Sequence, residues 1–370
     1  MVIKRLPYYQ QIGRAGRNID RAYVFLMSGQ EDETIVEYFI KTAFPSESET
    51  EQVLDCVRNS EGISIRGLEE KLNIRKARLE KAVTFLAKDG YLFKDKTKYY
   101  VSPKPFAYDR EHYEAITQRR YQEMEQMKQL VRTKECYSEF ITRALDDPDA
   151  APCGHCANCL GRELLPLETS FESREKASAY LEAQKLVIEP RKRWAITEFT
   201  TASNIEYKNE EGICLSKYGA PGYGELVKRD KYSTSRKFCE ELVGKSAQIL
   251  LPLIREKNIT HITCVPSLRS NLVKNFAKRL ADRCNIPFVE LLQKTHAEQQ
   301  KNMENSSHQC ANAFASFSVI EGTDMPERVL LVDDVVDSRW TLTVCGYRLM
   351  EQGCEAVFPY ALADSSQKEG

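Results

Sequence analysis

Two glycines and two arginines lie close together near the start of the sequence, in the octamer QQIGRAGR at residues 10–17. The glycines allow a tight backbone turn, and Arg14 and Arg17 carry guanidinium groups that stay charged and can bind a phosphate through paired hydrogen bonds. In nucleotide hydrolysis such an arginine neutralises the charge that develops on the transferred phosphoryl group. The octamer therefore predicts phosphate-facing arginines. The alternative is a basic Gly-Arg turn that binds any phosphate or none.

Four of the twelve cysteines have the spacing of a metal site. Cys136 precedes the run Cys153-x-x-Cys156-x-x-Cys159, in which closely spaced sulfurs can reach one ion. Four thiolates complete a tetrahedral shell around zinc and leave no position for water. The spacing therefore predicts a structural Zn²⁺ ion. The alternatives are His155 in place of one cysteine, or four unliganded thiols.

A second pattern suited to chemistry lies near the end of the sequence, where an apolar run at 329–332 is followed by Asp333 and Asp334. A buried parallel strand that ends in paired carboxylates can accept the two hydroxyls of a ribose, and the loop and helix that follow can hold a phosphate. The predicted ribose-phosphate site consists of Asp333, Asp334, Asp337, Ser338 and Thr341.

The composition is that of an ordinary soluble protein. A chain of 370 residues predicts two to four domains at about 150 residues each. It is 42% hydrophobic and 29% charged with a net charge of −1, so affinity for nucleic acid must come from local patches. No apolar run approaches the roughly 18 residues of a membrane span, and the first residues are too polar for a signal peptide. The cysteine pattern favours a reducing cytoplasm, and no membrane association is expected.

The elements that position these residues follow from the spacing of apolar side chains. Residues 22–27 predict a short buried strand, and residues 31–44 predict a helix that stops at Pro45. Residues 49–102 predict three amphipathic helices and a two-stranded hairpin, which is the pattern of a winged helix-turn-helix. A long polar helix is expected over 108–133.

The predicted winged helix carries a basic patch. Between Arg66 and Lys104 the sequence has eleven Lys and Arg residues against five Asp and Glu residues, a local charge of +6. Such a patch suits DNA phosphates, with the third helix near a groove and the wing along the backbone, although winged helices also dock proteins. The predicted DNA contacts are Arg75, Lys76, Arg78, Lys94, Lys96 and Lys98.

Two of these motifs together resemble the RecQ family of DNA helicases over residues 1–160. The octamer is similar to the last conserved motif of superfamily-2 helicases, and the cysteine spacing, with Pro152 before the triplet, resembles the RecQ zinc subdomain. The resemblance implies ATP-dependent 3′–5′ DNA unwinding in recombination and repair, with Arg14 and Arg17 facing ATP and Mg²⁺ in the complete motor. One departure is that the predicted winged helix precedes the zinc site, so the strand-separating hairpin of the family is not carried over.

The rest of the motor that such an arginine motif serves is missing from the sequence. Nothing matches the G-x-x-x-x-G-K-[ST] phosphate loop or an acidic magnesium-holding motif. We therefore expect no ATPase or helicase activity from this chain alone. Either the start lies inside a longer reading frame, through truncation or frame disruption, or an upstream polypeptide supplies the motor.

The last part of the sequence, residues 212–364, resembles type I phosphoribosyltransferases and in particular their ComF-like members. The order of strand, two aspartates, loop and helix is similar to their phosphoribosyl-pyrophosphate motif, and residues 261–267 look like the strand and loop that hold pyrophosphate. Residues 299–317 are similar to their mobile loop. The resemblance implies binding of phosphoribosyl pyrophosphate with Mg²⁺. Arg339 and Trp340 replace a glycine and a small residue of the family, and we expect the indole to crowd the phosphate cradle; a degenerate scaffold is the alternative to transfer.

We therefore expect a multidomain α/β protein in which the last domain has a Rossmann-like parallel sheet. Its expected parts are a remnant of helicase lobe 2 (1–45), a winged helix (46–107), a helical zinc-binding subdomain (108–162), a linker (163–211) and the phosphoribosyltransferase-like domain (212–364). The main hypothesis is the C-terminal part of a RecQ-like helicase. The alternatives are a stand-alone phosphoribosyltransferase with a DNA-binding, zinc-containing first half, and a non-catalytic DNA-binding adaptor.

Overall fold

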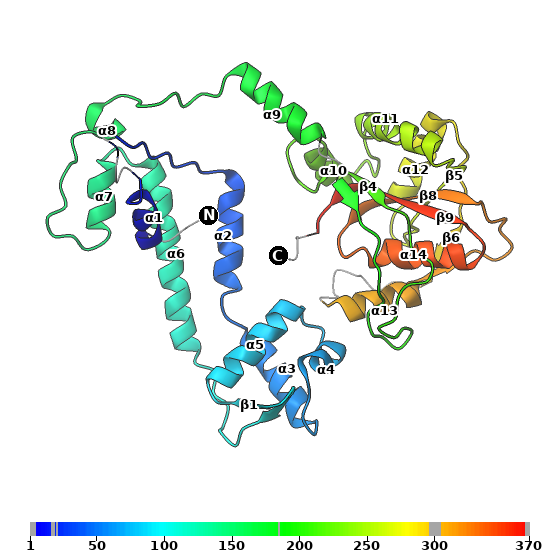
Figure 1. Cartoon of the computed structure of the whole chain (residues 1–370), viewed down its shortest axis with the longest axis horizontal. Helices are drawn as coiled ribbons and strands as arrows, with labels where there is room; N and C mark the ends of the chain where they lie inside the picture. Colours follow the sequence, from blue (N-terminus) through cyan, green and yellow to red (C-terminus); the bar gives the residue numbers. More distant parts are fainter. Residues whose placement is uncertain (1–4, 16–18, 20, 184–185, 296–304, 367–370) are drawn as a thin grey trace. The chain divides into compact units, whose positions relative to one another are not determined.

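The computed structural model describes residues 5–15, 19, 21–183, 186–295 and 305–366. The chain divides into two compact units, Met1–Ser64 with Ala77–Ala177, and Ile65–Lys76 with Ser178–Gly370 (Figure 1). Within the described ranges, no helix combines the length and the apolar composition that crossing a bilayer demands.

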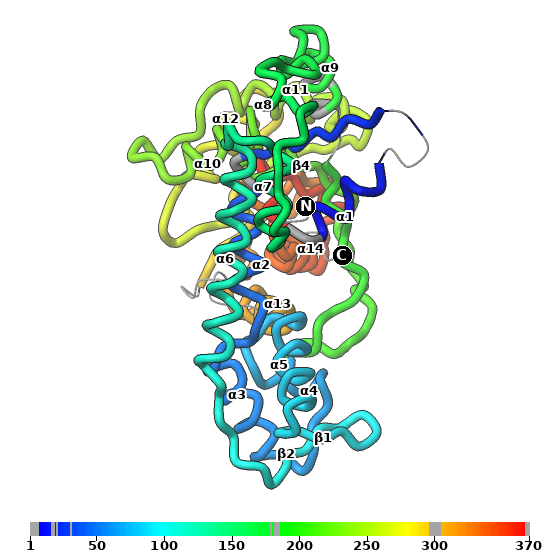
Figure 2. The backbone as a smooth tube through the Cα atoms, turned by 90° about the vertical axis from the view of Figure 1, so that its left-hand side faces the viewer, coloured from blue at the N-terminus to red at the C-terminus, as the bar shows by residue number. Residues whose placement is uncertain are grey.

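The first unit is mainly helical. Its helices outside the hairpin region are α1 (Arg5–Ile12), α2 (Gln30–Lys41), α6 (Arg110–Arg132), α7 (Tyr137–Arg143) and the short α8 (Ala157–Leu160). The long α6 begins at Asp109, whose carboxylate accepts a hydrogen bond from the His112 amide at 3.1 Å. Helix α2 runs beside α6 in both views (Figures 1 and 2), and Val36 and Ile40 pack against Met124.

The predicted order of three helices and a hairpin is present. It comprises α3 (Glu47–Arg58), α4 (Ile65–Lys71), α5 (Lys76–Lys88), β1 (Leu92–Asp95) and β2 (Lys98–Val101). Helix α3 begins with a capping box in which the Ser46 hydroxyl accepts from the Glu49 amide and the Glu49 carboxylate accepts from the Ser46 amide. The strands of the hairpin are antiparallel, and the preceding segment joins them through a bridge between Ile63 and Tyr99.

The expected strand at residues 22–27 is wrong. This segment has no regular structure, and its apolar side chains are exposed, with Tyr23 at 58% and Met27 at 76%. An apolar run becomes a buried strand only where a neighbouring strand can accept its backbone hydrogen bonds. None of the strands that the structure describes pairs with this segment. The helix expected to end before Pro45 is confirmed as α2.

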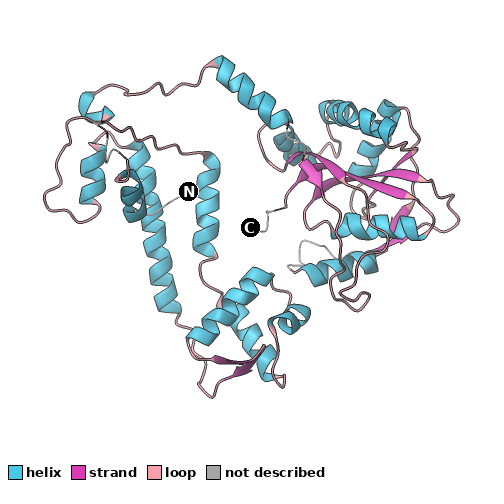
Figure 3. Cartoon of the chain, in the orientation of Figure 1, coloured by secondary structure: helices cyan, strands magenta, loops and turns pink. Residues whose placement is uncertain are grey.

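The second unit is built on a five-stranded sheet with the order β3-β4-β9-β8-β5. Its strands are β3 (Leu186–Ile188), β4 (Gly212–Lys217), β5 (His261–Cys264), β8 (Arg328–Val336) and β9 (Ala356–Asp364). The pairs β4–β9, β9–β8 and β8–β5 are parallel, and only the edge pair β3–β4 in this sheet is antiparallel (Figure 3). The predicted parallel-containing α/β sheet is thus present.

Helices cover both faces of this sheet. One core contains side chains of α10 (Tyr223–Lys231), α11 (Glu240–Glu256) and α12 (Leu272–Cys284), and the other contains side chains of α13 (Ser306–Ser316) and α14 (Trp340–Glu351). Beside them, β6 (Leu292–Lys294) pairs antiparallel with β7 (Phe317–Val319). Buried apolar strands sandwiched by helices explain the continuous Val329–Val332 run in the sequence.

Two sequence-based expectations for this unit need correction. The expected linker at 163–211 contains α9 (Phe171–Ala183) and the edge strand β3, and its Trp194 is buried in the sheet core. The expected mobile loop at 299–317 includes helix α13, while residues 296–304 lie outside the described residues.

Candidate functional site

The four cysteines predicted to bind metal are brought together in the first unit. The sulfur atoms of Cys136, Cys153, Cys156 and Cys159 all lie within 4.8 Å of one another. A tetrahedral shell with Zn–S bonds of about 2.3 Å places its sulfurs roughly 3.8 Å apart. The Sγ atoms of Cys136 and Cys156 are 3.9 Å apart, so the donor set fits zinc.

Local backbone structure holds the cysteines in place. Cys136 precedes the first turn of α7, and Cys156 precedes α8. The Cys153 amide donates a hydrogen bond to the Cys136 sulfur at 3.2 Å, and the Cys159 amide donates to the Cys156 sulfur at 3.4 Å. Gly154 has a positive φ of 77°, which favours glycine at this turn.

The electrostatics of the cluster call for a cation. Burial raises the pKa of the Cys136 thiol, but hydrogen bonds from backbone amides outweigh burial and lower it to about 6. For Cys159 a backbone amide lowers the pKa, yet the neighbouring thiols and burial outweigh it and raise the pKa to about 12. The neighbouring thiols therefore make it harder for Cys159 to lose its proton. A divalent metal ion offsets the repulsion between the thiolates, because its positive charge stabilises all four of them at once.

His155 does not replace one of the four cysteines in this cluster. Its Nδ1 lies 2.6 Å from the Cys153 carbonyl oxygen, so the ring interacts with the backbone. The shell of four sulfurs leaves no open position for water or substrate, which is the arrangement of a structural rather than a catalytic zinc site.

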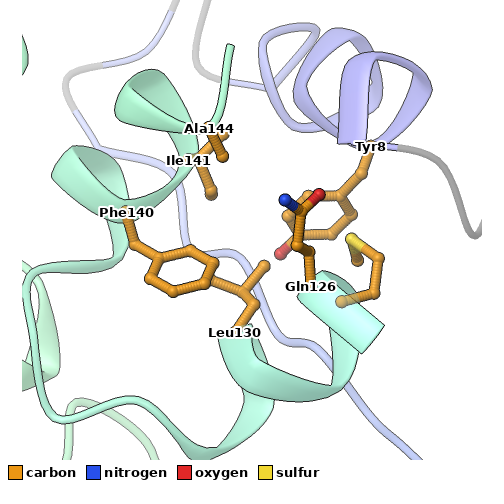
Figure 4. Close-up of a pocket in the computed structure, with 7 residues that line it drawn as sticks. Tyr8, Gln126, Leu130, Phe140, Ile141 and Ala144 are labelled. Carbon is orange, nitrogen blue, oxygen red and sulfur yellow. The ribbon is translucent and has the colours of Figure 1, made fainter. Parts of the chain in front are cut away.

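Helix α1, which carries the start of the arginine octamer, packs against the helices next to this cluster. Tyr8 lines a small cavity together with Gln126 and Leu130 of α6 and with Phe140 and Ile141 of α7 (Figure 4). The contact is largely apolar, and burial raises the pKa of Tyr8. The zinc cluster and the octamer are therefore joined through α7, whose first turn follows Cys136.

Of the two arginines of the octamer, the structure describes only Arg14. Arg14 lies in the exposed turn that follows α1, where the Arg14 amide donates to the Gln11 carbonyl oxygen at 3.2 Å. Arg17 lies outside the described residues. An ATP-facing role for both arginines stays a prediction.

Five of the six predicted DNA contacts are exposed. Three of these lysines belong to the hairpin, and Lys96 has a positive φ of 52° at its tip. The aromatic rings of Phe93 and Tyr100 stack on the same hairpin with centroids 5.4 Å apart. The exposed basic residues are Arg75, Lys76, Lys94, Lys96 and Lys98.

Arg78, the sixth predicted contact, is engaged inside the first unit. Its Nε donates to Glu49 Oε1 at 2.8 Å, and its Nη1 donates to the carbonyl oxygens of Thr42 and Phe44 at 3.1 and 3.2 Å. Only 20% of the Arg78 side chain is exposed. Sequence periodicity could not distinguish this arginine from its exposed neighbours, because its partners lie far away in the sequence.

In the second unit, the predicted acidic pair lies near the carboxyl end of β8. The strand continues through Asp333 and Asp334 to Val336, so the two carboxylates point toward opposite faces of the sheet. Asp334 Oδ2 lies 2.9 Å from the Nζ of Lys231, and Asp333 Oδ1 accepts a hydrogen bond from the Asp334 amide at 2.8 Å. No motif or spacing pattern in the sequence identified Lys231 as a residue of this site.

The charges around Asp333 are balanced. Burial and then the Asp334 carboxylate raise the pKa of Asp333 to about 7, while the Asp334 amide and the cations Lys231 and Lys294 oppose the rise. Burial in turn lowers the pKa of Lys294, and the charge of Asp333 partly restores it. The site thus combines two carboxylates with two ammonium groups.

The loop after the acidic pair has an unusual backbone conformation. Asp337 is exposed, Ser338 is half-buried, and Arg339 has φ 69° and ψ −3° just before α14. This left-handed conformation is one that favours glycine, so Arg339 occupies a backbone position that is unfavourable for a larger residue. Thr341 lies in the first turn of α14, next to Trp340.

The expected crowding of this loop by Trp340 is wrong. The indole is only 1% exposed and belongs to the core on the α14 face of the sheet. Its Nε1 donates a hydrogen bond to Ser306 Oγ at 2.9 Å, and its ring stacks on Trp194 with centroids 6.1 Å apart. The side chain is directed into the core because it lies on the apolar stripe of the helix.

Comparison with known proteins identifies the class of the zinc segment. Residues 95–160 match the RecQ zinc-binding family, and the match contains all four cysteines. This part of the chain is therefore a RecQ-type zinc-binding domain, and its cysteine cluster is a structural Zn²⁺ site. A comparison with curated proteins found no significant match.

Two solved structures are similar to part of the chain. The purine phosphoribosyltransferase from Pyrococcus horikoshii OT3 is 17% identical, and the alignment covers 35% of this chain and 87% of that one at a TM-score of 0.24. The adenine phosphoribosyltransferase from Trypanosoma brucei, solved with AMP, pyrophosphate and ribose-5-phosphate, is 17% identical, with 40% and 74% covered and a TM-score of 0.24. At such TM-scores the likeness supports no functional argument.

Proposed function

We propose that the first unit is the zinc-stabilised, DNA-binding C-terminal part of a RecQ-like helicase, and that the second unit binds a sugar phosphate. The observation that carries the first part is the cluster of four sulfurs within 4.8 Å, in a segment that matches RecQ zinc-binding domains. ATP hydrolysis, Mg²⁺ binding and 3′–5′ unwinding belong to the complete motor. Arg14 and Arg17 would contribute there to nucleotide binding.

Support for a DNA partner comes from the exposed basic hairpin. Lys94, Lys96 and Lys98 are exposed, and none of the three has an ion pair among the described residues. Exposed lysines without a carboxylate partner suit phosphates of any sequence. Binding of this kind releases counterions and weakens steeply with salt.

The test measures the affinity of the full chain for a fluorescent forked DNA at several salt concentrations. Replacing Lys94, Lys96 and Lys98 by glutamate should weaken binding and lower the slope of log K against log salt by about 0.9 for each lost phosphate contact. A matched variant reverses three exposed lysines elsewhere, Lys176, Lys228 and Lys237, and should bind like the parent. Equal loss in both variants would mean that net charge, rather than the hairpin, controls binding.

Support for a sugar-phosphate ligand comes from the acidic pair at the end of a central parallel strand. Ligands of open α/β sheets bind at the carboxyl ends of the strands. Asp333 and Asp334 lie at this end of β8, followed by a loop and the first turn of α14, and the N-terminus of a helix favours phosphate. Calorimetry with ribose 5-phosphate tests this, and Asp334→Asn should weaken the binding.

A further inference from the structure

The ion pair between Lys231 and Asp334 changes what the acidic pair can hold. Lys231 is the last residue of α10, and its Nζ lies 2.9 Å from Asp334 Oδ2. Both side chains are largely buried, with 25% and 17% exposed. A partly buried ion pair is screened less by salt and solvent than a surface pair. The Lys231 ammonium group therefore stays paired with Asp334 within the site.

Helix α10 holds Lys231 near this position at both of its ends. At the start, a Cβ atom on Gly224 would lie 2.0 Å from the Lys217 carbonyl oxygen, so the helix approaches β4 too closely for any larger residue. Near the end, Asp230 is buried and its carboxylate accepts a hydrogen bond from the Cys239 amide at 2.8 Å. The backbone of Lys231 therefore has little freedom to withdraw from Asp334.

A divalent cation does not fit this arrangement well. Mg²⁺ binds through carboxylate oxygens and waters in near-ideal octahedral geometry. One oxygen of Asp334 is occupied by an ammonium group, and one oxygen of Asp333 is occupied by the Asp334 amide. The positive charge of Lys294 also acts electrostatically on Asp333. A further double charge would be repelled by both lysines.

We propose that Lys231 takes the place of a divalent cation, so that this site binds a ribose 5-phosphate group without Mg²⁺. The ammonium group supplies positive charge and hydrogen-bond donors for the sugar and phosphate oxygens, while Asp334 keeps one oxygen for a ribose hydroxyl. The ligand class is then a ribose 5-phosphate monoester, either free or in a nucleoside 5′-monophosphate. A pyrophosphorylated sugar that travels as its magnesium complex would be disfavoured. This inference rests on the proposed sugar-phosphate binding.

The experiment titrates ribose 5-phosphate into the full chain with and without added Mg²⁺, in buffer free of chelator so that the zinc site stays intact. The parent should bind equally well in both conditions. Lys231→Met keeps the apolar stem of the side chain but removes its charge, so it should bind poorly without Mg²⁺ and recover when Mg²⁺ is added. Lys228→Met, an exposed position on the same helix, is the matched control and should behave like the parent.

Each outcome decides a separate point. Binding by the parent that requires Mg²⁺ overturns the role of Lys231 but keeps the sugar-phosphate function. Absence of binding in both conditions overturns the sugar-phosphate function itself. Mg²⁺ titrated alone then still tests the lysine: a parent site for Mg²⁺ that Asp334→Asn removes contradicts the inference. A Mg²⁺ site that appears only in Lys231→Met supports it.

Discussion

Arg191 donates two hydrogen bonds to the carbonyl oxygen of Ser338, from Nε at 2.8 Å and from Nη2 at 2.6 Å. Its guanidinium group also lies over the Trp340 ring, 4.1 Å from the centroid. In return, Arg339 Nη1 donates to the Glu189 carbonyl oxygen at 3.1 Å. A segment that sequence analysis assigned to a linker therefore holds the loop of the predicted phosphate site. Because a peptide carbonyl and the following amide point in opposite directions, Arg191 directs the Arg339 amide to the other side of the loop.

Replacing Arg191 by lysine should loosen this loop. Lysine cannot reproduce the planar fork that donates twice to one oxygen or the stacking on Trp340. We expect faster amide hydrogen exchange at residues 337–341 and a loss of roughly 1–2 kcal/mol in the free energy of unfolding. Arg193→Lys, an exposed position two residues away, is the control. Unchanged exchange in Arg191→Lys would show that the loop holds its shape without this arginine.

Trp340→Gly should destabilise the second unit rather than open a ligand site. The indole is buried, so its removal leaves a large cavity, and such truncations cost about 3–5 kcal/mol. Trp340→Phe keeps most of the packing and should lose about 1 kcal/mol, chiefly through the hydrogen bond to Ser306. Chemical denaturation measures both values. A glycine variant as stable as the parent would mean that the ring is not part of the core.

The zinc cluster and the main strands were predictable because their signals are local. Four cysteines at short spacings identify a metal site without knowledge of the fold. The apolar run before Asp333 likewise indicated the buried strand β8. In each case neighbouring residues of the sequence contain the whole pattern.

The remaining features depend on partners that are distant in the sequence. The apolar run at 22–27 looks like a strand, but pairing is decided by a neighbour that the pattern does not contain. Trp194 lies in the segment that was expected to be a linker, but it is buried in the sheet core, where its ring stacks on Trp340. Lys231 and Asp334 belong to different elements, so no spacing rule connects them. Sequence patterns therefore found the acidic pair but missed the cation beside it.

Arg78→Ala should destabilise the first unit in a pH-dependent way. The change leaves the part-buried Glu49 carboxylate and two carbonyl oxygens without their donor, which costs about 2–4 kcal/mol. Burial raises the pKa of Glu49, but hydrogen bonds from Arg78 and Ser46 outweigh it, so the net pKa lies below the usual 4.5. The contribution of this lowered pKa to the free energy of unfolding is fully present above about pH 4.5. It is lost as the pH falls through the lower pKa that Glu49 has in the folded state.

The two proteins should therefore differ most near neutral pH and converge in acid. Denaturation at several pH values measures this, and Lys76→Ala, an exposed neighbour, is the control. A difference that stays constant down to the most acidic condition would show that the ion pair is not its cause.

Zinc affinity should fall as the pH is lowered. Binding requires all four thiolates, and protons compete for them. The pKa of about 6 makes Cys136 a thiolate at neutral pH, whereas the pKa of about 12 means that Cys159 releases its proton when zinc binds. Competition with a chelator between about pH 6 and pH 8 should show tighter binding at the higher value. Affinity independent of pH would exclude thiolate ligation.

The most direct test of the proposed zinc-stabilised unit is the metal content of the full chain, purified without chelator and without added zinc. We predict about one Zn²⁺ per chain, from the single Cys₄ shell. Cys156→Ser should lose the metal and the hydrogen-exchange protection of residues 136–160, while Cys56→Ser, at a cysteine outside the cluster, should retain both. A folded parent protein that contains no zinc would contradict the account.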